Sequence, residues 1–233
     1  MKFNIDFADE KIKNIIEWVK TLIIAVVFAL VINNFILTNS FIPTPSMVPN
    51  LPVGSRLFGF RLNYLFTSVK RGDVVIFDYG FNCKKCHNMY QKNDENKCPN
   101  CKEESRGSEK VHYIKRVIGL PGERIEIKAD YIADSEMFRA IEFREPMQVP
   151  CGHVYINGEQ YIESYLNEPM IVDSNMYKGI DVVVPDDCYL LLGDNRNDSE
   201  DSRFWKKTFV PIKDIEAKAY FVYWPLYKIG IVK

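Results

Sequence analysis

Residues 154–162 read VYINGEQYI, in which two short runs of β-branched and aromatic residues flank Asn157-Gly158. The runs are Val154–Ile156 and Tyr161–Ile162. Asn-Gly tolerates the positive φ angles of a type I′ turn, the turn that suits the twist of two antiparallel strands. The segment therefore predicts a β-hairpin.

Further short strands are predicted on both sides of this hairpin. The candidates are Asp73–Phe77, Tyr113–Ile118, Arg124–Ile127, Tyr189–Leu192 and Ala217–Tyr223. This part of the chain shows neither an internal repeat nor a long helical period. Short strands at such spacing are typical of an antiparallel β-sandwich or barrel, so we expect a mostly β domain.

Composition narrows the class of protein further. The chain has 233 residues, with 30 Lys and Arg against 31 Asp and Glu, and a formal net charge of −1. Its length fits one domain with attachments, and 26% charged with 13% aromatic residues excludes a disordered chain. A nearly neutral chain does not suit a protein that coats nucleic acid, so we expect no nucleic-acid partner.

Residues 80–110 depart from the β pattern because they contain no Val, Ile or Leu. Such a segment cannot fold by burial alone and needs a cross-link. It carries two C-x-x-C pairs, which are typical of a zinc ribbon with four thiolate ligands. The candidate ligands are Cys83, Cys86, Cys98 and Cys101. Four thiolates leave no open coordination position, so a zinc ion here would be structural.

Two other interpretations of this segment stay open. Disulfides are plausible outside the cytoplasm. Cys83-x-x-Cys86-His87 also matches a c-type haem attachment string, although haem leaves the second cysteine pair unexplained. The remaining cysteines, Cys151 and Cys188, form either a disulfide or two buried thiols.

An uncharged segment near the N-terminus, Thr21–Leu37, reads TLIIAVVFALVINNFIL. Extended to residues 18–38, it is long enough to span a bilayer as a helix. A buried core helix would normally have a polar face, and Leu22–Ile32 has none. A cleaved secretory signal would need small residues in an Ala-x-Ala arrangement, which is absent after the apolar run. We therefore expect an uncleaved membrane anchor.

The flanking charges predict the orientation of the anchor. Lys11, Lys13 and Lys20 precede it, and no Lys or Arg follows before Arg56. Positive charge favours the cytoplasmic side. Residues 1–17 are thus predicted to be a cytoplasmic tail, and residues 39–233 an extracytoplasmic domain interrupted by the ribbon-like insertion at 80–110. The apolar run Leu57–Phe66 could either enter the membrane interface or form a core strand.

The segment Phe41–Leu51 contains a candidate nucleophile. Three prolines within seven residues fix the backbone around Ser46. A serine hydroxyl held rigidly among apolar residues is well placed for nucleophilic catalysis, although a proline-stiffened linker would look the same. The three histidines lie in no recognisable Ser-His-Asp arrangement, and H-E-x-x-H is absent, so the base must be another residue.

Lys115 is the candidate base. On a strand, Tyr113, Lys115 and Val117 share one face, so the lysine can point inward among apolar neighbours. Burial without a paired carboxylate lowers the pKa of a lysine by several units, which makes the neutral amine available. The alternative is an ordinary solvated charge at the edge of a sheet.

Four segments together resemble the ordered sequence boxes of bacterial type I signal peptidases, which are serine proteases with a Ser-Lys dyad. They follow the anchor in the family's order, and the similarity extends from about Ile23 to the C-terminus. The insertion at 80–110 falls between the second and third boxes. The four boxes are Pro43–Leu51, Arg71–Phe77, Tyr113–Gly122 and Gly193–Arg203.

The resemblance implies a role for each matching residue. Ser46 is the expected nucleophile and Lys115 its general base, while Thr44 and the Ser46 backbone N–H are expected to hold the oxyanion. Ser199 matches a serine that orients the lysine amine. Asp201 matches a structural aspartate, expected to pair with Arg203 or Arg116. The expected lining of the substrate pockets is Ile42, Pro43, Met47, Ile76 and Ile114.

The resemblance further implies a membrane-bound serine endopeptidase that removes signal peptides from exported preproteins after small residues in an Ala-x-Ala pattern. Its expected partners are these preproteins and the lipid bilayer, and it needs no cofactor for catalysis. Two alternatives exist. One is a self-cleaving Ser-Lys relative, which the anchor disfavours. The other is a membrane-tethered zinc-ribbon binding module without protease activity, which has no reason to keep all four of Ser46, Lys115, Ser199 and Asp201.

Overall fold

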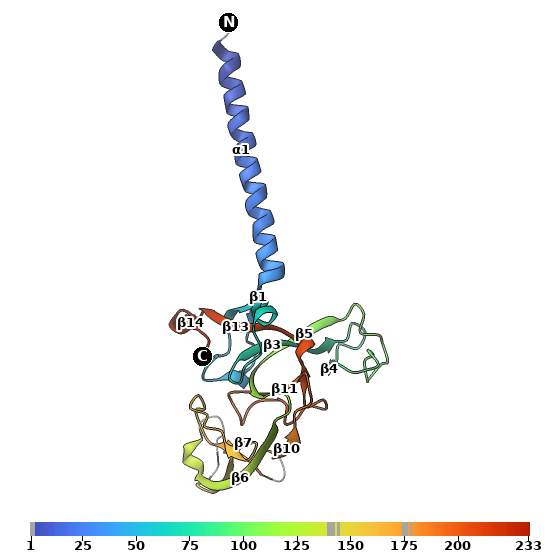
Figure 1. Cartoon of the computed structure of the whole chain (residues 1–233), viewed down its shortest axis with the longest axis vertical. Helices are drawn as coiled ribbons and strands as arrows, with labels where there is room; N and C mark the ends of the chain where they lie inside the picture. The colour runs from blue at the N-terminus through green and yellow to red at the C-terminus, as the bar shows by residue number, and fades with distance from the viewer. Residues whose placement is uncertain (1–2, 139–142, 144, 174–176, 178) are drawn as a thin grey trace.

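The computed structural model describes residues 3–138, 143, 145–173, 177 and 179–233. It consists of one long helix that projects from a body of β-sheet (Figure 1). Helix α1, Phe3–Val31, is followed by a short π-helical turn, Ile32–Ile36. The window Ile12–Val31 is long and apolar enough to cross a membrane, and none of it is buried against the rest of the chain.

The predicted span, 18–38, overlaps this helix but extends beyond it. Leu37 and Thr38 already belong to strand β1, which pairs with β2. The helix also continues back through most of the predicted cytoplasmic tail. Apolar character alone did not locate the C-terminal end, because the apolar residues Phe35, Ile36 and Leu37 resume after Asn33-Asn34 and lead into the strand.

The larger sheet lies next to the end of α1 and carries the candidate catalytic residues. All its strand pairs are antiparallel, and the main order is β1-β2-β13-β3-β5-β11-β12, with β14 beside β13 and β4 beside β3. In chain order the strands are β1 Leu37–Phe41, β2 Arg56–Phe60, β3 Val74–Asn82, β4 Met89–Gln91, β5 Glu109–Gly119, β11 Cys188–Leu192, β12 Val210–Pro211, β13 Ile215–Trp224 and β14 Gly230–Ile231.

The smaller sheet occupies the end of the body far from α1 (Figure 1). Its order is β10-β6-β7-β8, with β9 also on β7. Residues from both sheets, among them Ile118, Ile125, Val154 and Leu190, form one buried cluster that holds the sheets together. The strands are β6 Arg124–Asp134, β7 Gln148–Ile156, β8 Glu159–Gln160, β9 Met170–Ile171 and β10 Ile180–Val183. The mostly β, antiparallel prediction is confirmed.

Short helical turns complete the described elements: η2 Pro45–Met47, α2 Asn63–Phe66, η3 Ser135–Met137, η4 Ile212–Asp214 and η5 Leu226–Lys228. The run Leu57–Phe66 is a core strand at its beginning, while its end is exposed. Leu57 lies in β2 with its side chain fully buried, whereas Leu65 and Phe66 on α2 are 74% and 81% exposed.

The predicted hairpin is present at the expected turn. Asn157 and Gly158 have φ angles of 52° and 88°, as a type I′ turn requires. The returning strand begins earlier than predicted, because a two-residue turn places Glu159 directly opposite Ile156. Pairing continues to Tyr161, whose N–H donates to the Val154 carbonyl at 2.8 Å.

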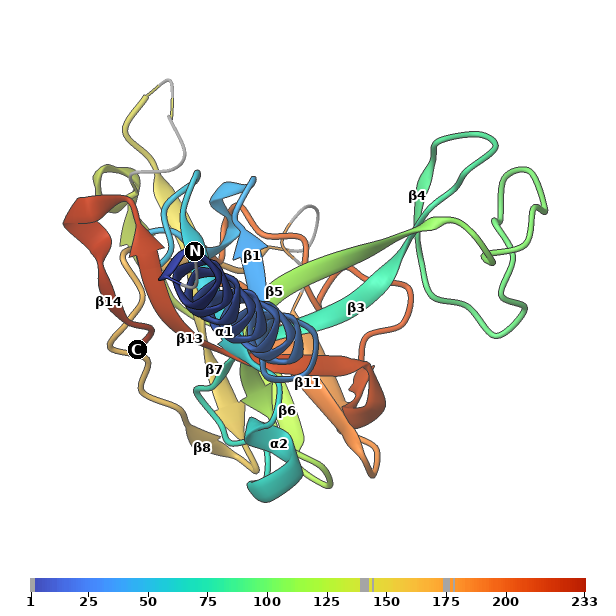
Figure 2. The same cartoon turned by 90° about the horizontal axis from the view of Figure 1, so that it is seen from above.

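The predicted insertion forms an arm at the side of the body (Figure 2). Strands β3 and β5 pair as far as Asn82 and Glu109, and residues 83–108 between them, including β4, are called the ribbon arm below. The arm leaves the body in the half nearer to α1 (Figure 1). Met89 of the arm lines the same cleft as Ser46.

Candidate active site

Ser46 is the middle residue of η2, a short turn that directly follows the extended residue Thr44. Proline at the start of this turn has the φ angle that a helical turn needs. Asn195 holds this turn in place. Its backbone N–H donates to the Ser46 carbonyl at 3.1 Å, and its side-chain amide donates to the Pro45 carbonyl at 3.3 Å. Ser46 is buried, so its hydroxyl has a fixed environment.

Lys115 reaches Ser46 from β5. Its Nζ lies 2.7 Å from the Ser46 Oγ, across 69 positions of sequence. Strand β5 turns this side chain inward, and Lys115 is almost completely buried. The predicted nucleophile and base are therefore within hydrogen-bond distance of each other, as proton transfer between them requires.

Burial lowers the pKa of Lys115 to about 8, because removal from water penalises the charged ammonium. Asp201, Glu200 and Asp194 act in the opposite direction at longer range, and Arg203 adds to the lowering. Desolvation outweighs the attraction of the acids. A substantial fraction of the amine is consequently neutral near pH 8, and a neutral amine can accept the proton of a serine hydroxyl.

Thr44 lies beside this pair. Its Oγ1 is 3.4 Å from the Ser46 Oγ. Thr44 also lines the cleft that contains Ser46. Together with the Ser46 N–H, it is a candidate donor to the negative charge that develops on the carbonyl oxygen.

Ser199 is buried next to the site, but the predicted contact with Lys115 is not formed. The Ser199 Oγ has no hydrogen-bond partner among the described residues. It packs against Gly193, where an added Cβ would lie 2.1 Å from the Ser199 Oγ and 2.6 Å from the Ser46 carbonyl oxygen. Only glycine leaves enough room at this point for the two segments to meet.

Arg203 and Arg116 have separate partners. Asp201 pairs with Arg203 at 2.8 Å and accepts the Gly193 N–H at 3.0 Å. Arg116 instead makes a two-pronged pair with Asp194, at 2.7 and 2.6 Å. Of the two predicted partners of Asp201, Arg203 is correct and Arg116 is wrong. The sequence had no means of separating them, because both acids belong to the same loop.

Asp194 and Asn50 were not predicted as part of the site. The Asn50 amide donates to the Asp194 carboxylate at 2.8 Å, so it ties the segment after Ser46 to the Asp194–Arg116 pair. Asp194 lies within the fourth box. The sequence alone offered no sign of its role, because only the structure shows that it faces a buried arginine. Such pairs need good geometry to offset their loss of hydration.

A cleft of about 460 Å³ runs over Ser46 and Lys115. Ile42, Pro43, Met47 and Ile114 line it, as predicted for the substrate pockets. Ile76 does not line it: it lies opposite Ile114 in the β3–β5 pair and is buried in the cluster beneath. The lining residues that the sequence did not indicate are Phe41, Met89, Val111, His112, Tyr113, Asp198 and Glu200.

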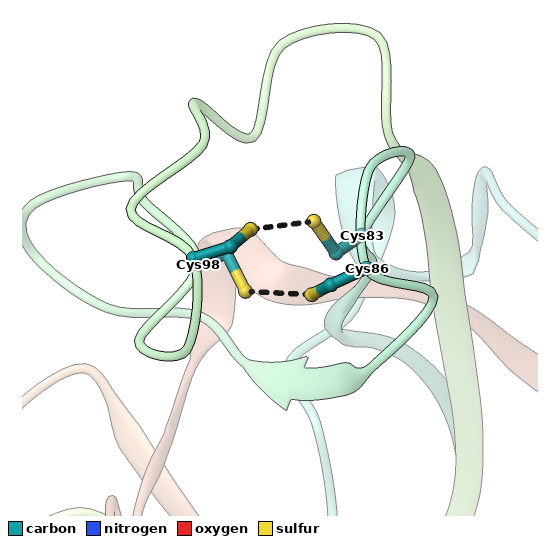
Figure 3. A group of neighbouring side chains, drawn as sticks. Cys83, Cys86 and Cys98 are labelled. Carbon is teal, nitrogen blue, oxygen red and sulfur yellow. Dashed lines mark hydrogen bonds between the residues drawn. The ribbon is translucent and has the colours of Figure 1, made fainter.

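The four ribbon cysteines face one another at the base of the ribbon arm (Figure 3). Their Sγ atoms all lie within 4.8 Å, with 3.5 Å between Cys83 and Cys101 and between Cys86 and Cys98. These separations exceed a disulfide bond of about 2.05 Å and leave space for a central ion. Each C-x-x-C pair also closes a tight turn with a backbone hydrogen bond back to its first cysteine.

The sequence also left open whether Cys151 and Cys188 form a disulfide or two buried thiols. Cys151 lies on β7 of the smaller sheet, and Cys188 lies on β11 of the larger one. Both are free thiols. The disulfide alternative is therefore wrong for this pair.

The family described as signal peptidase, peptidase S26, matches residues 15–224. The chain belongs to this signal peptidase family. The signal peptidase I of Leptolyngbya laminosa is 33% identical over 216 residues, which cover 93% of this chain and 83% of that protein. The probable signal peptidase I-2 of Synechocystis sp. is 30% identical over 217 residues, which cover 93% and 77%. A crystal structure of a signal peptidase I from Enterococcus faecalis covers 65% of this chain and 97% of that one, with 24% identity and a TM-score of 0.34.

The family resemblance predicted from the four boxes is confirmed. Membership of this family makes the chain a peptidase. Its apolar N-terminal helix suits a membrane anchor. Signal peptide removal needs no cofactor in this family. The candidate metal site in the ribbon arm is therefore separate from the peptidase chemistry.

Proposed function

We propose that this protein is a membrane-anchored serine endopeptidase that cleaves signal peptides from exported preproteins, with Ser46 as nucleophile and Lys115 as general base. The observation that carries the proposal is the 2.7 Å contact between the Lys115 Nζ and the Ser46 Oγ, in a buried site that lowers the pKa of the lysine to about 8. A buried lysine without this role would only destabilise the fold.

The reaction follows from the positions of these groups. The Ser46 Oγ attacks the scissile carbonyl carbon while its proton passes to the neutral Lys115 amine. The Ser46 N–H and the Thr44 hydroxyl donate to the resulting oxyanion. As the C–N bond breaks, Lys115 gives its proton to the departing amine. A water molecule then attacks the acyl-serine ester with Lys115 again as base, which releases the signal peptide and restores Ser46.

The walls of the cleft support a preference for small residues before the scissile bond. Ile42, Met47 and Ile114 narrow the cleft close to Ser46, so a bulky side chain would meet these apolar side chains. We therefore propose cleavage after Ala-x-Ala. The same cleft presents apolar surface to the alanine methyl groups, which favours them over polar residues of similar size.

The proposed function is tested with a preprotein that carries one Ala-x-Ala site. It is incubated in detergent with wild type, Ser46→Ala and Lys115→Met, and the products are identified by mass spectrometry. Wild type is expected to cleave after the second alanine, and both variants are expected to lose at least about a thousandfold in kcat/KM. Cleavage that survives Ser46→Ala would show that the nucleophile is another residue.

We further propose that Cys83, Cys86, Cys98 and Cys101 hold one structural zinc ion. The donor set fits, because four sulfur atoms converge from two tight turns in a segment that lacks aliphatic core residues. Metal analysis of the purified full chain is expected to find about one zinc per chain, falling to near zero in Cys98→Ser. Metal-free wild type with these cysteines joined as disulfides would contradict the proposal.

A further inference from the structure

The ribbon arm contributes to the cleft that contains Ser46. Met89, the first residue of β4, lines this cleft together with Val111 and Tyr113 of β5. The Tyr113 hydroxyl lies 3.7 Å from the Met89 Sδ. The cleft thus continues from the Ser46–Lys115 pair along β5 to a half-exposed apolar side chain that belongs to the arm.

Strand β5 has one unpaired edge in this region. Its pairing with β3 extends over Glu109–Arg116, whereas its pairing with β11 covers only Arg116–Gly119. Among the described strands, none occupies the second edge from Glu109 to Lys115. An extended polypeptide can add to such an edge through its main chain, and its alternate side chains then meet the walls of the cleft.

Distance along the strand places the arm at a defined separation from the bond that is cleaved. Val111 precedes Lys115 by four residues, which corresponds to about 13 Å of β-strand. A substrate strand beside β5 advances at the same rate. The substrate side chain that reaches Met89 and Val111 is therefore about four residues from the scissile bond.

Three sets of contacts fix the position of the arm and of the strand ends that carry it. Asp78 of β3 bonds Lys92 of the arm at 3.2 Å and Lys110 of β5 at 2.8 Å. Tyr79 and Tyr113 stack with their ring centroids 4.0 Å apart. Gln91, two residues after Met89, exchanges two hydrogen bonds with the backbone of residue 207, at 2.8 and 2.9 Å.

We infer that Met89 and Val111 form a distal subsite, which selects preproteins with an apolar side chain about four residues from the scissile bond. This inference rests on the proposed function, because it extends the cleft of the same peptidase. Met89 is a specificity-determining residue in it, supplied by an insertion whose cysteines hold the fold of the arm. The subsite would select among preproteins that all share the small residues next to the cleaved bond.

The test uses the full-length enzyme in detergent and a set of preproteins that share one Ala-x-Ala site. Each carries Leu or Asp at a single position, from three to six residues away from the scissile bond on either side. The ratio of kcat/KM for Leu over Asp is measured at every position. Because both substrates meet the same enzyme sample, this ratio is independent of the amount of folded protein.

Wild type is expected to prefer Leu by about tenfold at one of these positions. Met89→Lys should reverse the preference to Asp at that same position, because the lysine attracts the carboxylate. The matched control is Met137→Lys: Met137 is 53% exposed against 51% for Met89, but it lies on η3, away from the cleft. Met137→Lys is expected to keep the wild-type ratios at every position.

An unchanged ratio at all positions in Met89→Lys, with wild type active, would overturn the distal subsite and leave the proposed function intact. Absence of Ser46-dependent cleavage by wild type would overturn the proposed function, and the subsite with it.

Discussion

At the scale of single residues, Lys115 is the group whose protonation should govern the reaction. Its pKa is lowered to about 8 by burial, and only the neutral amine can accept the Ser46 proton. We therefore expect kcat/KM to rise with pH, with a midpoint near 8, and to approach a plateau above it. Initial rates on one preprotein between pH 6 and 10 measure this profile. A flat profile across this range would show that Lys115 does not act as the base.

The same lowered pKa makes a prediction about stability. The pKa of Lys115 falls from 10.5 in the unfolded chain to about 8 in the folded protein. Below pH 8 the lysine is charged in both states, and its burial then lowers the free energy of unfolding. Lys115→Met removes this charge while it keeps most of the side-chain volume. At pH 7 the variant is expected to be inactive but more stable than wild type, by at most roughly 3 kcal/mol.

Denaturant unfolding at pH 7 and pH 10.5 measures this change in the free energy of unfolding. The gain should shrink at the higher pH, where the lysine is neutral in the folded state and only half charged in the unfolded state. A loss of stability at pH 7 would mean that the contact between Lys115 and Ser46 outweighs desolvation.

Gly193 has the clearest steric requirement in the site. A Cβ at this position would lie 2.1 Å from the Ser199 Oγ and 2.6 Å from the Ser46 carbonyl oxygen, and a backbone oxygen cannot move without moving its own segment. Gly193→Ala is therefore expected to lower kcat by about a hundredfold or more, through misplacement of Ser46. Single-turnover rates measure the effect. Gly158→Ala, at a distant turn on the smaller sheet, controls for the general cost of removing a glycine.

At the scale of structural elements, the base of the ribbon arm is fastened by a charge cluster around Asp78. The His112 Nδ1 lies 3.0 Å from Asp78 and 3.5 Å from Glu216, and Lys92 and Lys110 also bond Asp78. The hydrogen bond to Asp78 raises the pKa of His112 above its usual 6.5, against the opposing effect of burial. The charged histidine thus strengthens the joint between β3, β5 and β13.

This raised pKa has a defined sign in stability. The contribution of His112 is complete below pH 6.5, where it is charged in both states, and it declines as the pH rises through the folded-state pKa. Wild type should exceed His112→Asn in free energy of unfolding by more at pH 5.5 than at pH 9. Because His112 is partly exposed, the difference should stay below about 1 kcal/mol. Equal differences at the two pH values would contradict a charged His112 in this cluster.

At the scale of the whole molecule, the N-terminal tail and the β domain should lie on opposite sides of the membrane that the anchor crosses. Lys13 lies at the N-terminal end of the apolar window, ahead of the predicted span 18–38, and Lys97 and Lys102 are exposed on the ribbon arm. A membrane-impermeant amine reagent applied to intact cells is expected to modify Lys97 and Lys102 and to spare Lys13, because flanking positive charge retains the N-terminus in the cytoplasm. Mass spectrometry of the isolated protein identifies the modified lysines.

Opened cells serve as the control, in which Lys13 should also react. Modification of Lys13 in intact cells, with the arm protected, would reverse the proposed orientation. Since the cleft opens on the same domain as the arm, that result would also place Ser46 in the cytoplasm.

Local features of the sequence were sufficient for the hairpin, for the existence of an apolar helix and for the grouping of the four ribbon cysteines. The Asn157-Gly158 turn, the apolar window and the spacing of the cysteines each depend on residues close together in the chain. Turn angles, the length of an apolar run and cysteine spacing are local properties, which explains why these features agree with the structure. Ser46 and Lys115 emerged from the combination of proline-restricted backbone, strand alternation and the resemblance of the surrounding boxes.

Only the tertiary structure decided which distant groups meet. The assembled structure brings Lys115 to Ser46 across 69 positions and Arg116 to Asp194 across 78. It also buries Ile76 and brings Met89 of the insertion to the wall of the cleft. The physical reason is that burial and contact depend on strand order and register, which no single segment specifies. The lowered pKa of Lys115 is the clearest case, since desolvation exists only once the surrounding strands have assembled.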